Sequence, residues 1–122
     1  STGVSAADRV KTVLTAIDDM ASSQDLVKPG HMFPLKAHMQ GVFARQGHTE
    51  GSVDLARIAG FKPAAVLCEV MNPDGTMMRG NELLDFAKQH DLPMLTIDDI
   101  LTYRVSTENL FHEEASSQLH LD

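Results

Sequence analysis

The stretch RQGHTEGSVDLARIAG, which runs from Arg45 to Gly60, decides where the central helix of this chain begins and ends. Three apolar residues near its end share one helical face, which predicts an amphipathic helix: Leu55, Ile58 and Ala59. Thr49 or Ser52 can cap the N-terminus of this helix, and Gly60 suits the position just after its C-terminus.

The residues at the start of this helix have the chemistry of an anion site. A helix N-terminus presents free N–H groups and a partial positive charge. Gly47 lets the backbone approach a ligand closely, Thr49 adds a hydroxyl donor, and Arg45 can pair with phosphate oxygens in a bidentate manner. His48 is better suited to a metal ion or to proton transfer. The alternative is that Thr49 is only a cap and His48 is a solvated loop residue.

Outward from this stretch, the sequence predicts further helices and several short strands. Apolar periodicity and capping residues predict helices over 6–19, 82–90 and from Asp98 or Asp99 to Tyr103. Short apolar runs predict strands over 32–33, 42–43, 64–70 and 93–97. Asp74 and Gly75 predict a turn. This order indicates an α/β or α+β fold in which helices cover a sheet that is too small to be complete.

The predicted strand AAVLCEV (64–70) contains one charged residue, Glu69. A carboxylate on an apolar strand needs partners, or its pKa rises, and a raised pKa suits a general acid or base. The alternative is that Glu69 lies at the end of the strand and reaches water. Cys68 points to the opposite strand face and is expected to be a small core residue.

Two further segments contain polar residues with two possible interpretations each. Thr2, Gly3 and Ser5 precede Asp8, so this segment can supply donors to an anion at the start of the first helix or simply cap that helix. His31 lies between turn signals, where a histidine is usually exposed.

Composition excludes several classes of protein. The chain has 122 residues, of which 43% are hydrophobic, and a formal charge of −7. This charge argues against an extended nucleic-acid surface. The absence of a long apolar run argues against a membrane protein, and a single cysteine is consistent with a reducing cytoplasm. The chain begins without methionine, so we expect it to be part of something longer.

Taken together, these segments resemble the 3,4-dihydroxy-2-butanone 4-phosphate synthase family of riboflavin biosynthesis. The segments in question are STGVSAADR, KPGHMFPL, RQGHTEGSVDLARIAGFKPAAVLCEVMNPDGTM and FAKQHDLPMLTIDDILTYR. They occur in the order and spacing of that family and cover residues 1–104. Each segment is a weak signal, but the joint pattern is specific.

The resemblance implies a lyase that uses magnesium (or manganese) to convert ribulose 5-phosphate into the four-carbon phosphate and formate. It also implies a cytoplasmic homodimer, with no nucleic-acid or membrane partner. The family fold is α+β, a mixed sheet flanked by helices in a three-layer, α/β/α-like arrangement.

The resemblance also implies a role for each matching residue. Four residues would bind the substrate phosphate and hydroxyls: Arg45, Gly47, Thr49 and Thr2. His31 would reach across the dimer interface into the active site of the other subunit. His48 would ligate the metal ion, Glu69 would shuttle protons, and Asp8 would orient a substrate hydroxyl.

The family pattern is only partly present in this sequence. Residues 1–107 match the C-terminal part of the synthase domain, and residues 108–122 are expected to form a linker or tail. That tail resembles the connector that leads to a GTP cyclohydrolase II-type domain in bifunctional members. The acidic loop and reactive cysteine of the family's N-terminal half do not occur in this sequence. We therefore expect this chain alone to be inactive, or to be a non-catalytic remnant that serves dimerisation or sugar-phosphate binding.

Overall fold

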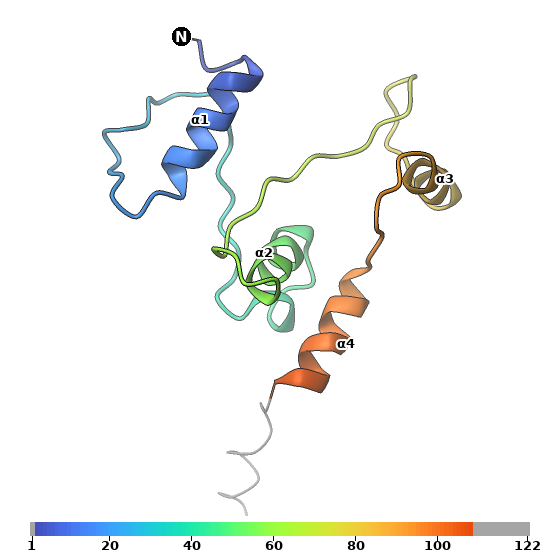
Figure 1. Cartoon of the computed structure of the whole chain (residues 1–122). Helices are drawn as coiled ribbons and strands as arrows, with labels where there is room; N and C mark the ends of the chain where they lie inside the picture. Colours follow the sequence, from blue (N-terminus) through green and yellow to red (C-terminus); the bar gives the residue numbers. More distant parts are fainter. Residues whose placement is uncertain (1, 109–122) are drawn as a thin grey trace, which may run out of the picture.

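The computed structural model describes residues 2–108 of the chain, and the helices within that range follow one another through long extended connections (Figure 1). Their order is α1 (Ala6–Ala16), the short 3-10 helix η1 (Gly41–Phe43), α2 (His48–Ile58), α3 (Asn81–Gln89) and α4 (Ile97–Thr107). From residue 109 onward, the predicted linker or tail lies outside the described residues.

The packed centre of the described chain consists of η1, α2 and α4. Val42 of η1 and Ile100 of α4 are buried there. Gly51 brings α2 close to α4, because a Cβ atom at this position would lie only 2.6 Å from Cδ1 of Ile97. A glycine on this face of α2 therefore permits close approach of the two helices, despite the entropic cost of glycine inside a helix.

A buried ion pair fastens η1 to both helices. Asp54 accepts hydrogen bonds from the backbone N–H of Val42 at 2.9 Å and from Nη1 of Arg104 at 3.0 Å. The same Nη1 donates to the carbonyl of Gln40 at 2.8 Å, and the guanidinium carbon lies 4.0 Å from the centre of the Phe43 ring. Every partner in this pair is hydrogen-bonded, which is the condition under which a buried charge is tolerated.

Helix α1 is attached by side-chain contacts instead of by helix packing. Within the described residues, α1 packs against no other helix. Lys62 Nζ donates to the carbonyl of Ile17 at 2.7 Å, just after the end of α1, and forms an ion pair with Asp19 at 3.0 Å. Arg9 Nη1 lies 3.9 Å from the sulfur of Met32. These contacts place α1 beside the segments that precede η1 and follow α2 (Figure 1).

The predicted helices form, but their boundaries differ from the predictions. The first helix ends at Ala16 instead of residue 19, because Asp18 accepts from the N–H of Met20 and turns the chain. Ser5 caps it, as predicted, by accepting from the N–H of Asp8 at 3.1 Å. The last helix is longer than predicted, because Thr96, not Asp98 or Asp99, is its N-cap.

The predicted strands are wrong for the described residues. Residues 42–43 belong to the 3-10 helix, and residues 32–33, 64–70 and 93–97 form no strand. The only pairing within residues 2–108 is an isolated antiparallel bridge between Met71 and Met77. A strand requires a neighbour that completes its hydrogen-bond ladder, and residues 64–69 run extended without one (Figure 1). The expected three-layer sheet is therefore not formed within the described chain.

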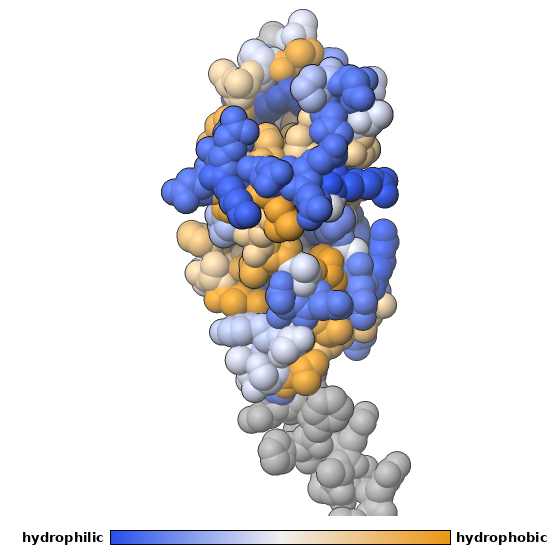
Figure 2. All heavy atoms as spheres, turned by 90° about the vertical axis from the view of Figure 1, so that its right-hand side faces the viewer, coloured by the Kyte–Doolittle hydropathy of each residue, from blue (hydrophilic) through white to orange (hydrophobic). Residues whose placement is uncertain are grey.

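Much apolar surface is left uncovered by this arrangement. Val42, Ala87 and Ile100 are the buried hydrophobic residues of the described chain, whereas large apolar side chains such as Leu14 and Leu67 are exposed. On the face that carries α3 and α4, hydrophobic and hydrophilic patches lie side by side over the surface (Figure 2). The described chain thus has helices with apolar faces but too few layers to bury them.

Candidate functional site at the start of helix α2

The first turn of α2 is the most completely built of the predicted site segments. Gly47 is the N-cap and His48 is the first helical residue, so α2 begins earlier than a cap at Thr49 or Ser52 would allow. The first N–H groups of a helix have no intrahelical acceptor. Arg45 lies close to this end of the helix, because a Cβ atom on Gly47 would be 3.6 Å from its Nε, and the positive end of the helix dipole lies there too.

Arg45 lies at this helix start and is held by a carboxylate. Its Nε lies 3.7 Å from Oε2 of Glu50, and its side chain is 70% exposed. Within residues 2–108, the Glu50 ion pair is the one side-chain interaction of Arg45. A guanidinium anchored through Nε keeps its two Nη groups available for an oxyanion.

Glu50 is a residue of this site that sequence reasoning missed. It is fully buried, and its Oε1 accepts from the backbone N–H of His38 at 3.1 Å. This hydrogen bond lowers the pKa of Glu50 below its ordinary value of 4.5, although burial acts in the opposite direction. Glu50 follows Gly47 by three positions, as the glutamate of a capping box follows its N-cap residue, although glycine lacks the hydroxyl of that motif. This spacing was the feature of the sequence that could have indicated Glu50.

Gly47 has a packing reason to be glycine. A Cβ atom at this position would lie 2.6 Å from Oε2 of Glu50. Close approach of a ligand was the predicted reason, but the buried carboxylate already requires a residue without a side chain. Thr49 follows in the first turn and is half-buried, whereas His48 is exposed.

The N-terminal residues of the predicted site form a second group at the start of α1. Gly3 has φ of 75° and lies next to His31, because a Cβ atom on Gly3 would be 3.7 Å from its Nδ1. Thr2 adjoins Gly3 and is exposed, and Asp8 is half-buried in the first turn of α1. The structure therefore brings His31 next to Gly3, although the two residues are far apart in the chain.

Glu69 lies on the extended segment that follows α2 and is exposed, in agreement with the alternative in which it reaches water. Cys68 is also exposed, so its prediction as a core residue is wrong. The reason is the missing sheet, because within the described chain this segment faces α1 only across an open groove.

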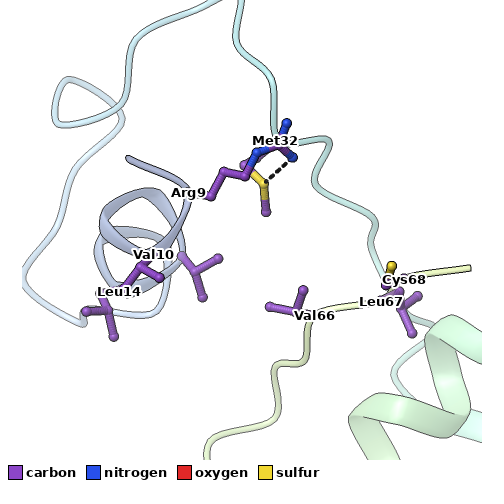
Figure 3. A pocket seen from close by; sticks show the side chains of 8 residues that line it. Arg9, Val10, Leu14, Met32, Val66, Leu67 and Cys68 are labelled. Carbon is purple, nitrogen blue, oxygen red and sulfur yellow. Dashed lines mark hydrogen bonds between the residues drawn. The ribbon is translucent and has the colours of Figure 1, made fainter. Parts of the chain in front are cut away.

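An open groove of about 390 Å³ lies between α1 and this extended segment (Figure 3). Its lining is mostly apolar and consists of Arg9, Val10, Val13, Leu14, Met32, Val66, Leu67 and Cys68. Neither His48 nor Glu69 contributes to this lining. The groove therefore does not unite the predicted catalytic residues.

The described residues do not make a metal site by themselves. Within residues 2–108, no three His, Cys, Asp or Glu side chains gather closely enough to hold a metal ion. His48 supplies one imidazole nitrogen, whereas magnesium requires several oxygen ligands in an octahedral arrangement. None of the helices in this range has the length and apolar character that a membrane span requires.

Comparison with known proteins identifies what this chain resembles over most of its length. A curated 3,4-dihydroxy-2-butanone 4-phosphate synthase from Shewanella woodyi is 59% identical over 107 residues, which are 88% of this chain and 49% of that protein. This chain thus spans about half the length of the curated relatives it matches.

Two solved structures share its fold. A two-domain 3,4-dihydroxy-2-butanone 4-phosphate synthase from A. baumannii is 48% identical and superposes with a TM-score of 0.86 over 89% of this chain and 32% of that chain. Another synthase, solved in complex with two magnesium ions, is 34% identical and gives a TM-score of 0.75 over 88% of this chain and 55% of that chain.

The sequence model of one family, 3,4-dihydroxy-2-butanone 4-phosphate synthase, matches residues 1–103. The helix start at Arg45 to Thr49 and the N-terminal group around His31 both lie within this match. Because the match covers most of its length, this chain belongs to the 3,4-dihydroxy-2-butanone 4-phosphate synthase family.

Proposed function

We propose that this chain provides the phosphate-binding and proton-transfer part of a lyase that converts ribulose 5-phosphate into 3,4-dihydroxy-2-butanone 4-phosphate and formate. The observation that carries the proposal is the arrangement at the start of α2, where the ion pair with Glu50 places Arg45 beside the first turn of the helix. Family membership supports the reaction, and the partial length of the match makes the activity a property of a larger assembly.

The helix start suits the phosphate end of the substrate. The Nη groups of Arg45 can form charge-assisted hydrogen bonds with two phosphate oxygens. Backbone N–H groups after Gly47 and the hydroxyl of Thr49 can donate to the remaining oxygens. Binding the non-reacting phosphate in this way positions the reacting carbons.

The remaining predicted residues would act on the sugar. Glu69 would take and return protons at the carbons of the substrate, and Asp8 would orient a hydroxyl group. Thr2 would add a donor, and His31 would complete the site of a second subunit in a homodimer. The exposure of Glu69 supports this role only if the substrate and further polypeptide cover it, because a general base near neutral pH needs partial desolvation.

The metal requirement is met only in part by this chain. We propose that His48 supplies one nitrogen ligand to magnesium, or to manganese. The oxygen ligands would come from polypeptide outside the described residues, because those residues hold no cluster of suitable side chains. The metal ion would stabilise enediolate and oxyanion charge when bound. A phosphorylated sugar substrate and a single cysteine favour the cytoplasm as the place of action.

The same larger assembly would complete the sheet. Residues 64–70 already have an extended backbone, so strands from outside the described chain could pair with both of their edges. We propose that this pairing produces the mixed sheet of an α+β, three-layer fold and brings Glu69 towards the substrate.

A complementation assay tests this function. This chain is mixed with the separately produced remaining half of the Shewanella woodyi synthase, magnesium and ribulose 5-phosphate, and formate is measured. We expect formate release that is abolished by His48→Ala and strongly reduced by Arg45→Ala. The exposed Arg79 lies in the loop before α3, so Arg79→Ala is the matched control and should leave the rate unchanged. No formate from any mixture, or a phosphorylated product without formate, would contradict the proposal.

A second candidate is a non-catalytic protein that binds sugar phosphates or dimerises. The absence of a metal-binding cluster within residues 2–108 favours it. It predicts that ribulose 5-phosphate binds to the chain, that Arg45→Ala weakens this binding, and that no complementing half restores formate release. The two candidates therefore differ in turnover and share the anion site.

A further inference from the structure

We infer that Glu50 is a positioning residue, which anchors the Nε edge of Arg45 at the start of α2 so that the Nη edge faces the bound anion. This inference rests on the proposed function, because the anion is the phosphate of the substrate. It assigns a role to a buried acidic residue that sequence reasoning did not single out.

The first argument is the burial of Glu50. Its side chain is fully buried in the third position of α2, where Oε1 accepts from the N–H of His38 at 3.1 Å. Within the described residues, Oε2 has no hydrogen-bond partner and is buried. A buried carboxylate oxygen without a partner is costly, so it favours whatever cation can approach it.

The second argument is the convergence of three groups. Nε of Arg45 lies 3.7 Å from Oε2 of Glu50. A Cβ atom on Gly47 would lie 2.6 Å from the same oxygen and 3.6 Å from Nε of Arg45. The N-cap, the carboxylate and the guanidinium therefore lie close together, and a side chain at position 47 would displace the carboxylate.

The third argument concerns charge. A carboxylate beside an anion site repels the anion, so by charge alone Glu50 weakens phosphate binding. Its benefit must be geometric. An arginine whose Nε stays near a carboxylate samples fewer conformations than a freely rotating arginine, so it loses less conformational entropy when its Nη groups bind phosphate. The hydrogen bond from the N–H of His38 fixes the position of the Glu50 carboxylate and links the segment before η1 to the first turn of α2.

The variant Glu50→Gln of the full chain distinguishes the effect of Glu50 on the orientation of Arg45 from the effect of its negative charge on the anion. The amide oxygen of glutamine can still accept from His38, so the fold is preserved while the anchor for Arg45 is lost. Two quantities are measured on 15N-labelled protein. One is the resonance and solvent exchange of the Arg45 Nε–H, identified by its loss in Arg45→Lys. The other is the Kd for inorganic phosphate.

We expect the Nε–H resonance of Arg45 to move to the free-arginine position in Glu50→Gln, and its exchange with solvent to become faster than in the wild type. We expect the Kd for phosphate to rise by roughly 3- to 10-fold, since the ion pair with Glu50 no longer orients the guanidinium. Gly47→Ala should have the same two effects without changing any charge, because its methyl group displaces the carboxylate.

Opposite results would overturn the inference. Tighter phosphate binding in Glu50→Gln would show that Glu50 acts only through its charge, and an unchanged Nε–H would show that it does not hold Arg45. If the wild type binds phosphate and both variants bind it equally well, only the positioning role of Glu50 fails. If the wild type binds no phosphate, the anion site of the proposed function fails, and this inference fails with it.

Discussion

Arg104 links three parts of the described chain, although no sequence motif marks it. Its guanidinium donates to Asp54 of α2, to the carbonyl of Gln40 before η1 and to both oxygens of Glu108. The hydrogen bonds with Glu108 raise the pKa of Arg104 above its ordinary value, so this cation stays charged in all conditions of interest. A lysine has one point of charge and cannot reach these partners together.

We therefore expect Arg104→Lys to lower the free energy of unfolding by roughly 1–3 kcal/mol, because buried acceptors lose their donors. Urea denaturation followed by circular dichroism measures this change. Arg57→Lys is the matched control: its pair with the same Asp54 is longer, 3.4 Å, and half-exposed, so its effect should stay within about 0.5 kcal/mol. Equal effects of the two variants would contradict a special role for Arg104.

Acid should destabilise the chain through carboxylates whose pKa values are lowered by folding. The pKa of Glu50 is lowered chiefly by the His38 N–H, and that of Glu108 chiefly by Arg104. A lowered pKa in the folded state means that the unfolded state takes up protons first. Their contribution is therefore complete above the ordinary value of 4.5 and is lost as the pH falls through the lower folded values.

A pH titration of helix content by circular dichroism tests this expectation. The wild type should lose helix as the pH falls below 4.5, the ordinary pKa of a glutamate. Glu50→Gln has no proton to take up at this position, so its stability should depend less steeply on pH. Identical pH profiles would show that the carboxylate of Glu50 contributes nothing to this dependence.

The helices differ in how their ends are made. Thr96 and Asp99 form a full capping box at α4: the Asp99 N–H donates to the Thr96 hydroxyl at 3.1 Å, and the Thr96 N–H donates to the Asp99 carboxylate at 2.8 Å. Helix α1 has the cap at Ser5, but within the described chain it packs against no other helix. The destabilisation caused by losing a cap should therefore extend to other helices from α4, but not from α1.

We expect Thr96→Ala to destabilise the chain by about 1 kcal/mol, the usual cost of a lost N-cap. Hydrogen exchange of backbone amides locates the effect. Faster exchange should appear in α4 and also in α2, which packs against it, whereas Ser5→Ala should affect α1 alone. Exchange that changes only within α4 in the Thr96 variant would contradict the coupling of the two helices.

As a whole, the described chain has more apolar surface than it can cover. Leu14 and Leu67 on the two sides of the groove are 59% and 46% exposed, and residues 64–70 offer unpaired backbone groups as well. Exposed apolar patches and free strand edges are typical of surfaces that take a partner. Such a chain should bind further copies of itself when no other polypeptide is present.

Sedimentation velocity at increasing protein concentration measures this self-association. We expect the average mass to rise with concentration and the double substitution Leu14→Ser with Leu67→Ser to weaken the rise. Val27→Ser is the control, because Val27 is 89% exposed and does not line the groove. A wild-type chain that stays monomeric at every concentration would refute the view that these surfaces require a partner.

The sequence by itself determined the helices, the turn at Asp74 and Gly75 and the family. Helix formation depends on bonds between residues that are near in the chain, so the periodicity around Leu55 and the cap at Ser5 were sufficient evidence. The glycine and arginine at the start of α2 were also visible in the sequence, although the reason for Gly47 was not. The carboxylate of Glu50 explains the glycine at position 47, and the capping-box spacing between the two residues could have indicated it.

Only the tertiary structure decided which residues are buried and which segments are paired. Asp54 and Arg104 are 50 residues apart in the chain, and His31 meets Gly3 across the whole of α1. Residues 64–70 have a strand sequence, but a strand exists only where a distant segment completes its ladder. Non-local partners cannot be read from local pattern, because the energy that selects them comes from burial and pairing in three dimensions.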